Sequence, residues 1–531
     1  MFSVISVMSA SAMLPVNIKG TMGATGLNAL SIGNVDPKSN LLWVHVGVFA
    51  LSIIWVLWSI VGELRIYTHL RMWWLTSGHA STASASTVLI SDIPSSLMND
   101  DKRIHTLFDS MFPGGVRQLF VNRSSKKLID IVDRRNSLAS KLEKLLTDYA
   151  VKCLKAWEQA ERIGALYTPP ARPMAMKGLR IPFLSSCRTD AFEYYASEIL
   201  VCNRYISETA ENMDLLERQP SALVMFNKQI AAHMAAQTVL DFQPFSMARV
   251  STNVNPEDII WSNLQISPWS RRIRGYISFI ITVALIVLWT VLTAILSSLV
   301  QVNSLVELKA FHWLKVNSIV MGMFSGIVPS LVLAVLMNLL PTVLRLLLRV
   351  EGTTRRSEID LRLLHRYYFF QIWNIYLVSI FSSSVFQIAV KSIGEPGKIV
   401  ELIQTQVPQS ATNILTYVLL LAFLGAAKEV LQGTRLALRY VLPLLLPNTP
   451  RNICRAETPA EFDWGTSIPT HSLIFVMGFS YSFIAPIVNW FVAVYFGLFY
   501  LIYRYQFLYV YNDTNWSTGG LSFPKSVKQM L

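Results

Sequence analysis

The feature that most constrains this chain is a series of apolar runs. Each run approaches or exceeds the ~20 residues that an α-helix needs to cross the hydrocarbon of a bilayer. The runs lie at 41–62, 276–300, 317–348, 367–390, 411–427 and 465–503. Of the 531 residues, 52% are hydrophobic and 15% are charged, whereas soluble domains carry about 25% charged residues. The sequence therefore predicts a polytopic α-helical membrane protein.

Residues 76–265 have a different composition, rich in Asp, Glu, Lys and Arg, that is typical of a solvated domain with a core of its own. Alternation and apolar periodicity predict strands at 87–94, 116–123, 221–227 and 247–252, and helices at 100–112, 126–162 and 228–239. This order is βαβ–βαβ with a long helical insertion, which predicts an α+β ferredoxin-like (RRM-like) domain. We expect no nucleic-acid binding, because Leu89, Ile90, Val224 and Met225 stand where RNA-binding modules place stacking aromatics.

Basic residues at the ends of the apolar runs predict the topology. Arg271, Arg272 and Arg274 precede the run 276–300, and six arginines lie between 345 and 366. Positive charge favours the cytoplasmic side of a span, so residues 65–270 are expected in the cytosol. This bias also accounts for the net charge of +13 without nucleic acid. We expect a multi-pass protein of the plasma membrane rather than of an internal membrane.

These arguments divide the chain into four parts. The expected parts are an N-terminal membrane region 1–75 (partial helix about 3–16, full span 41–64), a cytosolic domain 76–265, a membrane domain 266–508 and a tail 509–531. The spans of the membrane domain are expected at about 276–300, 317–344, 367–390, 411–433 with an extension to 447, 465–484 and 487–508. The first 17 residues also have some character of a signal peptide, but they lack a basic start.

Motifs for catalysis or metal binding are not apparent in the sequence. Cys153, Cys187, Cys202 and Cys454 form no CxxC pair and fall in segments assigned to the cytosol, so we expect reduced thiols. Phosphate loops, nucleophile elbows and HExxH helices are not found in a plausible context. The sequence thus predicts no enzyme, no catalytic residue, no metal site and no cofactor.

Polar residues inside the spans carry the functional hypotheses, because polar groups in hydrocarbon are costly. Lys428 and Glu429 follow the apolar run LLLAFLGAA and are followed by Gln432. Two interpretations are open: a charged turn on an ion pathway, or the inner end of a helix with Lys428 reaching the headgroups.

A second polar set lies along span 367–390. It forms a stripe of Gln371, Asn374, Ser379, Ser382, Ser383, Ser384 and Gln387, with Ser330, Asn338, Asn413 and Thr416 as possible partners on neighbouring spans. Such a stripe fits the wall of a wet path, and it also fits hydrogen bonding between helices. Gly425 permits a bend or close packing in span 411–433.

Several stretches, in order, resemble one family. They read DIIWSNLQISPWSRRIRGY, SGIVPSLVLAVLMNLLPTVLRLLLRVEG, RRSEIDLRLLHRYYFFQIWNIYLVSIFSS and IFVMGFSYSFIAPIVNWFVAVYFGLFYLIYRYQFLYVYN. They are similar to the calcium-permeable stress-gated cation channels, the hyperosmolality-gated OSCA group with its fungal relatives. The upstream TVLISDIPSSLMNDDKRIHTLFDSMFPGGVRQLFVNR resembles that family's cytosolic domain.

The resemblance implies an all-α polytopic membrane bundle of anoctamin-like architecture, a homodimer formed through the cytosolic domain, and conduction of calcium, potassium and sodium when membrane tension rises. Under this resemblance the spans from 276 to about 433 and the one that follows line the pore. The pore and gating candidates are then Gln371, Asn374, Ser383, Gln387, Asn413, Thr416, Gly425, Lys428 and Glu429. Glu429 matches the acidic residue beside a gating bend, and Lys428 stands where many relatives have Gly.

Compared with the family pattern, the chain is expected to be truncated at both ends, with a stub at 3–16 and two further helices absent after residue 531. The sequence therefore predicts a mechanically or osmotically gated, calcium-permeable cation channel in contact with membrane lipids. The alternatives are a lipid scramblase of anoctamin-like fold and an inactive, truncated paralogue or scaffold.

Overall fold

The computed structural model describes most of the chain. Outside the description are residues 25, 113, 125, 178–186, 244, 245, 248, 300–335, 378, 379, 381–406, 409, 434, 437, 438, 441–448 and 513–515, and the side chains of 175–177, 187, 188, 290 and 293–299. Most of the predicted span 317–344 and the second half of 367–390 fall there, as do Ser383 and Gln387. The described residues form two compact units. Unit 1 comprises 1–86, 253–430 and 461–531, and unit 2 comprises 87–252 and 431–460.

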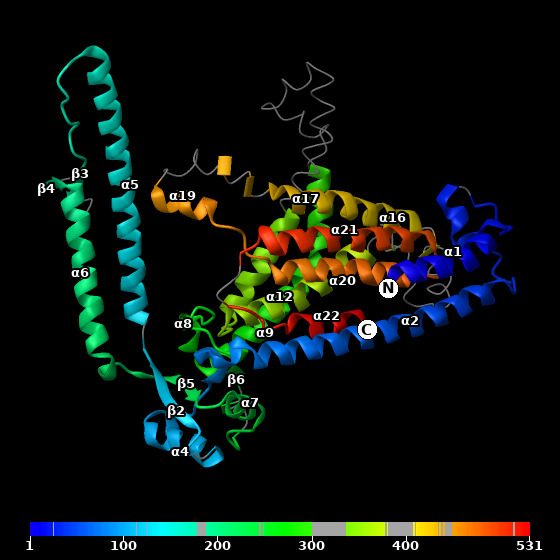
Figure 1. The fold of residues 1–531 in the computed structure, drawn as a ribbon, viewed down its shortest axis with the longest axis horizontal. Helices are drawn as coiled ribbons and strands as arrows, with labels where there is room; N and C mark the ends of the chain where they lie inside the picture. The colour runs from blue at the N-terminus through cyan, green and yellow to red at the C-terminus, as the bar shows by residue number, and fades with distance from the viewer. Residues whose placement is uncertain are drawn as a thin grey trace. The chain divides into compact units, whose positions relative to one another are not determined.

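Unit 1 is built from helices (Figure 1). They are α1 (Phe2–Ile18), α2 (Leu42–Thr76), α8 (Trp261–Leu264), α9 (Pro268–Leu299), a helix over 336–350, α12 (Arg356–Gln371), α16 (Ala411–Leu420), α17 (Ala426–Leu431), α20 (Trp464–Ser480), α21 (Ile487–Tyr509) and α22 (Ser522–Met530). Two π-helices, η7 (Ile372–Leu377) and η8 (Leu421–Gly425), continue α12 and α16. Short 3-10 turns lie at Gly26–Leu30, Ile32–Asn34, Gly78–Ser81 and Ala83–Ser86.

Among the described residues, four helical stretches are long and apolar enough to cross a membrane. They are Leu42–Ser81, Pro268–Trp289, Ala411–Leu431 and Ile487–Tyr509, and α1 is a shorter apolar helix. Each corresponds to an apolar run of the sequence. The predicted apolar runs are thus confirmed as helices at these four places.

Helix boundaries differ from the sequence prediction at several places. The helices α9 and α12 begin at Pro268 and Arg356, ahead of the predicted starts at 276 and 367, and two further boundaries have a local cause. The span expected at 41–64 continues as helix to Thr76, because residues 63–76 contain neither proline nor glycine and the helix stops only before Gly78. The span expected at 465–484 ends as helix at Ser480. Residues 481–484 form a turn ahead of Pro486, and the residue before a proline is disfavoured in helical conformation.

The core of unit 1 is made by helices that lie side by side. One apolar cluster joins α1, α16, α20 and α21, and it includes the fully buried Tyr481 and Tyr495. A second cluster joins α9, the helix 336–350 and α12 through Trp289, Leu344 and Phe370. Because α12 also packs along α20, the two clusters share one helical framework.

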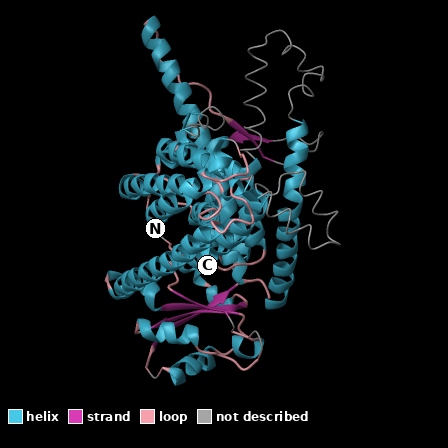
Figure 2. Ribbon diagram, turned by 90° about the vertical axis from the view of Figure 1, so that its right-hand side faces the viewer, coloured by secondary structure: helices cyan, strands magenta, loops and turns pink. Residues whose placement is uncertain are grey.

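Unit 2 contains a four-stranded sheet in the order β2-β5-β1-β6, with every neighbouring pair antiparallel. Its strands are β1 (Thr87–Ser91), β2 (Val116–Arg123), β5 (Arg218–Phe226) and β6 (Arg249–Thr252). The helices α4 (Asp101–Met111) and α7 (Gln229–Gln237) cover one face, and α3 (Ser95–Met98) precedes α4. Figure 2 shows these strands with the helices against them. Phe226 is 1% exposed and contacts Phe108 edge-on, so this aromatic side chain of β5 belongs to the core.

A long helical hairpin extends from this sheet. It consists of α5 (Lys126–Ile163) and α6 (Ala191–Glu211), which run side by side in Figure 1, and the short strands β3 (Met174–Lys177) and β4 (Cys187–Asp190) lie between them in the chain. The helix α19 (Pro450–Glu457) attaches to α5: Glu143 accepts a hydrogen bond from the Arg451 N–H at 2.9 Å and lies 3.3 Å from the Arg451 guanidinium. The segment that follows α17 is therefore bonded to the hairpin.

Candidate functional site

Two of the predicted pore residues, Gln371 and Asn374, bond to neighbouring helices. Gln371 is 2% exposed at the end of α12, and its Nε2 donates to Thr470 Oγ1 of α20 at 3.1 Å. Asn374 lies in η7, and its Nδ2 donates to the Ile286 carbonyl of α9 at 3.0 Å. Asn374 Oδ1 is buried without a hydrogen-bond partner among the described residues. For these two side chains the interhelical bonding considered from the sequence is present.

Asn413 and Thr416 lie on an exposed face of α16. They share this face with Leu420 and Leu424, since positions three and four apart are neighbours on a helix. Thr416 Oγ1 donates a hydrogen bond to the Thr412 carbonyl at 2.8 Å. The opposite face of α16 is buried in the core of unit 1. The exposed face is thus polar in its first half and apolar in its second.

Two of the candidate pore helices, α12 and α16, are each continued by a π-helical segment. π-segments are rare, and they occur mostly as single-turn insertions at functional sites. The first, η7, holds Asn374, and the second, η8, ends at Gly425. A Cβ at Gly425 would lie 3.3 Å from Phe499 Cζ of α21. A side chain at this position would therefore have to displace the ring that packs on the π-segment.

Glu429 is anchored one turn after η8. Its Oε2 accepts a hydrogen bond from Tyr511 Oη at 2.7 Å, and its main-chain carbonyl accepts one from Gln506 Nε2 at 2.7 Å. Glu429 is half-buried, whereas the adjacent Lys428 is exposed. Beyond α17, Gln432 has φ 47°, a left-handed conformation that ends the helix. The structure therefore gathers Gly425, Lys428 and Glu429 beside α21, and Gln371 and Asn374 beside α20 and α9.

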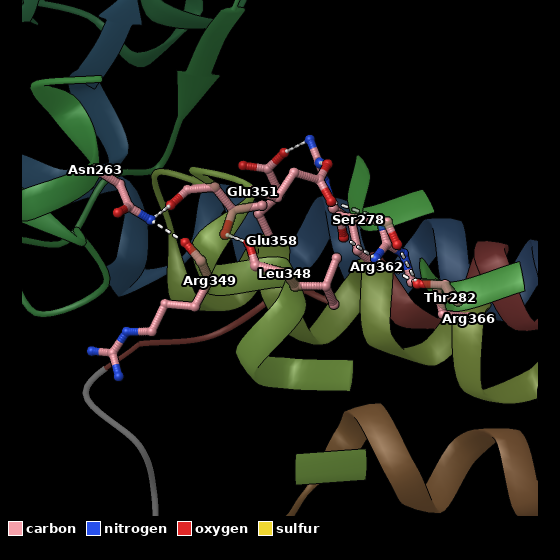
Figure 3. A network of polar contacts seen from close by, with 10 residues as sticks. Asn263, Ser278, Thr282, Leu348, Arg349, Glu351, Glu358, Arg362 and Arg366 are labelled. Atoms are coloured by element: carbon pink, nitrogen blue, oxygen red, sulfur yellow. Dashed lines mark hydrogen bonds and ion pairs between the residues drawn. The ribbon is translucent and has the colours of Figure 1, made fainter. Parts of the chain in front are cut away.

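A buried ion-pair network, not foreseen from the sequence, ties these helices together at their other end (Figure 3). Glu351 is 8% exposed; its Oε1 lies 2.5 Å from Arg362 Nη1 and its Oε2 lies 2.6 Å from Arg366 Nη2. Arg366 Nη1 also donates to Ser278 Oγ at 2.7 Å and Thr282 Oγ1 at 3.1 Å, both on α9. One carboxylate thus joins the end of helix 336–350, α12 and α9.

The segment ahead of α9 is clamped to the same place. Asn263 Nδ2 donates to the carbonyls of Arg349 at 2.9 Å and Thr353 at 2.8 Å. Asp258 is 1% exposed and accepts from Arg355 Nε at 2.7 Å and from Ser357 Oγ at 2.6 Å. These bonds hold the entry to α9 against the entry to α12.

The comparisons with known proteins cover almost the whole chain. A family described as "Calcium-dependent channel, 7TM region, putative phosphate" matches residues 274–531, "Cytosolic domain of 10TM putative phosphate transporter" matches 85–263, and "Late exocytosis, associated with Golgi transport" matches 1–63. The Arabidopsis thaliana protein named Hyperosmolality-gated Ca2+ permeable channel 1.8 is 26% identical over 98% of this chain. The Saccharomyces cerevisiae protein named Uncharacterized protein RSN1 is 27% identical over 98% of it.

The chain belongs to the family of hyperosmolality-gated, calcium-permeable channels and their fungal relatives. The resemblance inferred from the sequence is thereby confirmed. The chain spans 63% and 55% of the lengths of these two relatives. Like the family it is a multi-pass membrane protein with a cytosolic domain.

The arginine run of this channel-family member has a structural use besides orienting spans. Arg355, Arg362 and Arg366 are engaged in the ion pairs described above, whereas Arg349 and Arg356 are exposed. The spacing of Glu358 and Arg362, four residues apart on one helix, is a sequence signal for a pair, and their atoms lie 2.5 Å apart. The pairs made by Glu351 join two separate elements, the end of helix 336–350 and α12, so no local pattern reveals them.

Asp360 lies beside this network on the cytosolic end of α12. Burial raises the pKa of Asp360 to about 7, and the negative charge of Asp463 is the second cause. The charges of Asp258 and Glu461 raise this pKa further. Arg345, 3.8 Å away, opposes the shift, but it is shared with Asp463 at 2.8 Å. Asp360 thus titrates in the physiological range.

Replacing Glu351 by Gln should destabilise the protein by about 3–5 kcal/mol, because two largely buried guanidiniums lose their counter-charge. Glu358→Gln is the matched control, since it removes a more exposed carboxylate from the same Arg362 and should cost about 0.3–0.5 kcal/mol. The measurement is the unfolding midpoint of the purified protein in detergent. Equal losses in the two variants would contradict the central place of Glu351.

Asp360 predicts a specific dependence of stability on pH. A carboxyl whose pKa is higher in the folded than in the unfolded state binds more protons when folded, so stability falls as pH rises from about 4 to about 7. The side chain of the Asp360→Asn variant is neutral at every pH, so this variant should not show the decrease in stability. Melting temperatures between pH 5 and 8 should therefore drop more steeply in the parent than in the variant, and parallel curves would refute the shift.

Proposed function

We propose that this chain forms a mechanically or osmotically gated, calcium-permeable cation channel whose gate includes the segment 421–429. The names of the plant relatives support calcium permeation in the family. The observation that carries the proposal is the position of the Lys428 and Glu429 turn, directly after a π-helix and inside an apolar stretch long enough to span a membrane. Sodium and potassium are expected to permeate as well.

The π-segment supplies a physical basis for gating. An α-helix advances by about 100° per residue, so conversion of η8 to regular α-helix would turn everything beyond it by about one residue. One of the two side chains, Lys428 or Glu429, would then point in the direction that the other has now. Gly425 suits such a rearrangement because it lacks a side chain that would collide with the ring of Phe499 as the segment turns. Membrane tension would favour whichever form occupies more area in the bilayer.

The electrostatics of the turn fit cation passage. A carboxylate lowers the energy of a cation 4 Å away by ~1–4 kcal/mol for effective dielectrics between water and a protein surface. Lys428 opposes this attraction with a charge of the same sign as the permeating ion. Glu429 is also held by Tyr511, so opening would have to break or carry along that 2.7 Å bond.

The remaining architectural proposals rest on the family resemblance. We infer an anoctamin-like membrane bundle, a ferredoxin-like cytosolic domain, a homodimer formed through that domain, and placement in the plasma membrane. The sheet order and the interleaved helices of unit 2 support the ferredoxin-like assignment. The domain limits 76–265 and 266–508 also remain proposals.

Currents recorded from stretched patches test the role of the charged turn. Lys428→Gly should raise cation current or ease opening, because it removes an opposing charge and adds flexibility, whereas Glu429→Gln should lower calcium preference. Tyr511→Phe is the matched control that removes the anchor and keeps the carboxylate, so it should shift the threshold and leave selectivity unchanged.

Parent-like gating and conductance in all three variants would place the ion pathway elsewhere. Fluorescent-lipid translocation in proteoliposomes without any stretch-activated current would instead favour the scramblase alternative.

A further inference from the structure

A cavity of about 540 Å³ lies in unit 1 where the helix 336–350, α12, and the segments 461–464 and 516–518 meet. Its lining includes Ile260, which falls within the match to the family's cytosolic domain. Arg345, also in the lining, follows directly on the predicted apolar span 317–344. The cavity is therefore on the cytosolic side, at the level where phospholipid headgroups border the protein.

The charges in this cavity are of two kinds. Arg345 is already used, because its Nη2 lies 2.8 Å from Asp463 Oδ1, 2.9 Å from Asp463 Oδ2 and 3.8 Å from the carboxylate of Asp360, which also lines the cavity. Arg349, Arg356 and Glu461 are exposed and form no ion pair among the residues that the structure describes. The cavity thus offers two unpaired guanidiniums and one unpaired carboxylate.

The backbones of the two free arginines are fixed although their side chains are not. The Arg349 carbonyl accepts from Asn263, and the Arg356 N–H donates to the Asp258 carbonyl at 2.9 Å. Figure 3 shows the Arg349 side chain extending away from the buried network. Guanidiniums on fixed backbones suit the oxygens of a phosphate, which they contact through paired hydrogen bonds.

An aromatic wall, made of Phe462, Trp464 and Phe507, lies beside these charged residues. Trp464 is 39% exposed and stacks on Phe507 with ring centroids 5.7 Å apart, while Phe462 contacts Trp464 edge-on at 4.7 Å. The face of a tryptophan attracts a cation, and tryptophan is enriched at membrane interfaces. With Glu461 nearby in the chain, this wall suits a positively charged group.

We propose that the cavity binds a phosphate that carries a neighbouring primary ammonium group, as in the headgroups of phosphatidylserine and phosphatidylethanolamine. Arg349 and Arg356 hold the anionic oxygens, and Glu461 with Trp464 holds the ammonium. A purely anionic headgroup would face the uncompensated charge of Glu461. A free phosphorylated amine has the same chemistry, so the source is a separate question.

The cavity is connected to the turn that carries Glu429. Phe462 contacts Tyr511 edge-on with centroids 5.3 Å apart, and the Tyr511 hydroxyl bonds Glu429. A ligand that orders Phe462 would therefore strengthen the anchor of Glu429. This consequence for gating rests on the proposed channel function, whereas binding itself does not.

Native mass spectrometry of the full chain, purified and delipidated in detergent, tests binding. Phosphatidylserine and phosphatidylethanolamine should be retained at least tenfold better than phosphatidylglycerol. The double variant Arg349→Gln, Arg356→Gln should lose this retention by about tenfold. Glu461→Gln should weaken retention of the two amine lipids about fivefold and should not weaken retention of phosphatidylglycerol, because it removes the charge that opposes a purely anionic headgroup.

Arg274→Gln is the matched control, because Arg274 is exposed on α9 outside the cavity lining. An equal loss in this control, or no preference for amine lipids in the parent, overturns the proposal, and so does a Glu461→Gln variant that keeps the parent's full preference for the amine lipids. If free phosphoethanolamine displaces the bound lipid, the natural ligand is a soluble phosphorylated amine. If it does not, the natural ligand is the membrane lipid. Unchanged melting temperatures of the variants exclude misfolding. The assay measures lipid binding without any current, so its result does not depend on whether the protein conducts ions.

Discussion

The buried carboxylate of Glu351, held between Arg362 and Arg366, is the interaction on which the arrangement of the membrane helices depends. Charges removed from water are costly unless they are paired and hydrogen-bonded. Here two guanidiniums, one carboxylate and two hydroxyls of α9 satisfy one another. Separating α9 from α12, or either from the helix 336–350, would leave charges uncompensated. The network therefore fixes the cytosolic ends of these helices as one body.

From this fixed end a series of contacts leads to the charged turn. The helix α12 packs along α20 and continues into the π-segment that holds Asn374. The helix α21 presents Phe499 to Gly425, and beyond it Tyr511 bonds Glu429. The segment after α17 is bonded to α5 through Arg451 and Glu143. The turn thus belongs to the framework of unit 1, and the chain that follows it belongs to the same unit as the hairpin.

The sequence predicted the elements that depend on local pattern. Apolar runs of about 20 residues located α2, α9, α16 with α17, and α21, and strand alternation located β1, β2, β5 and β6. Helix ends were less accurate: Arg65, His69 and Arg71 interrupt the apolar run of α2 after its predicted end, yet the helix continues to Thr76. The candidate residues Gly425, Lys428 and Glu429 were found because they interrupt an apolar run.

What the sequence did not reveal depends on contacts between distant segments. No local sequence pattern predicts the π-helices. The structure shows that η7 contacts α9 and α20 and that η8 contacts α21. The polar stripe showed Gln371 and Asn374 but not that they bond to α20 and α9. The arginines between 345 and 366 resembled simple orientation signals, since their partners Glu351, Asp258 and Asp463 come from three separate segments.

The proposed channel requires the polar half of the exposed face of α16, which carries Asn413 and Thr416 and leads to the charged turn, to border an aqueous cation path. Reaction of Thr416→Cys with a charged, membrane-impermeant thiol reagent, in a background freed of native cysteines, tests it most directly. The control is Ile54→Cys on α2, where the native side chain is 63% exposed on an apolar helix. The account predicts at least tenfold faster modification at Thr416→Cys, with a fall in stretch-activated current. Equally slow reaction at both positions would mean that this face meets lipid, and would contradict the account.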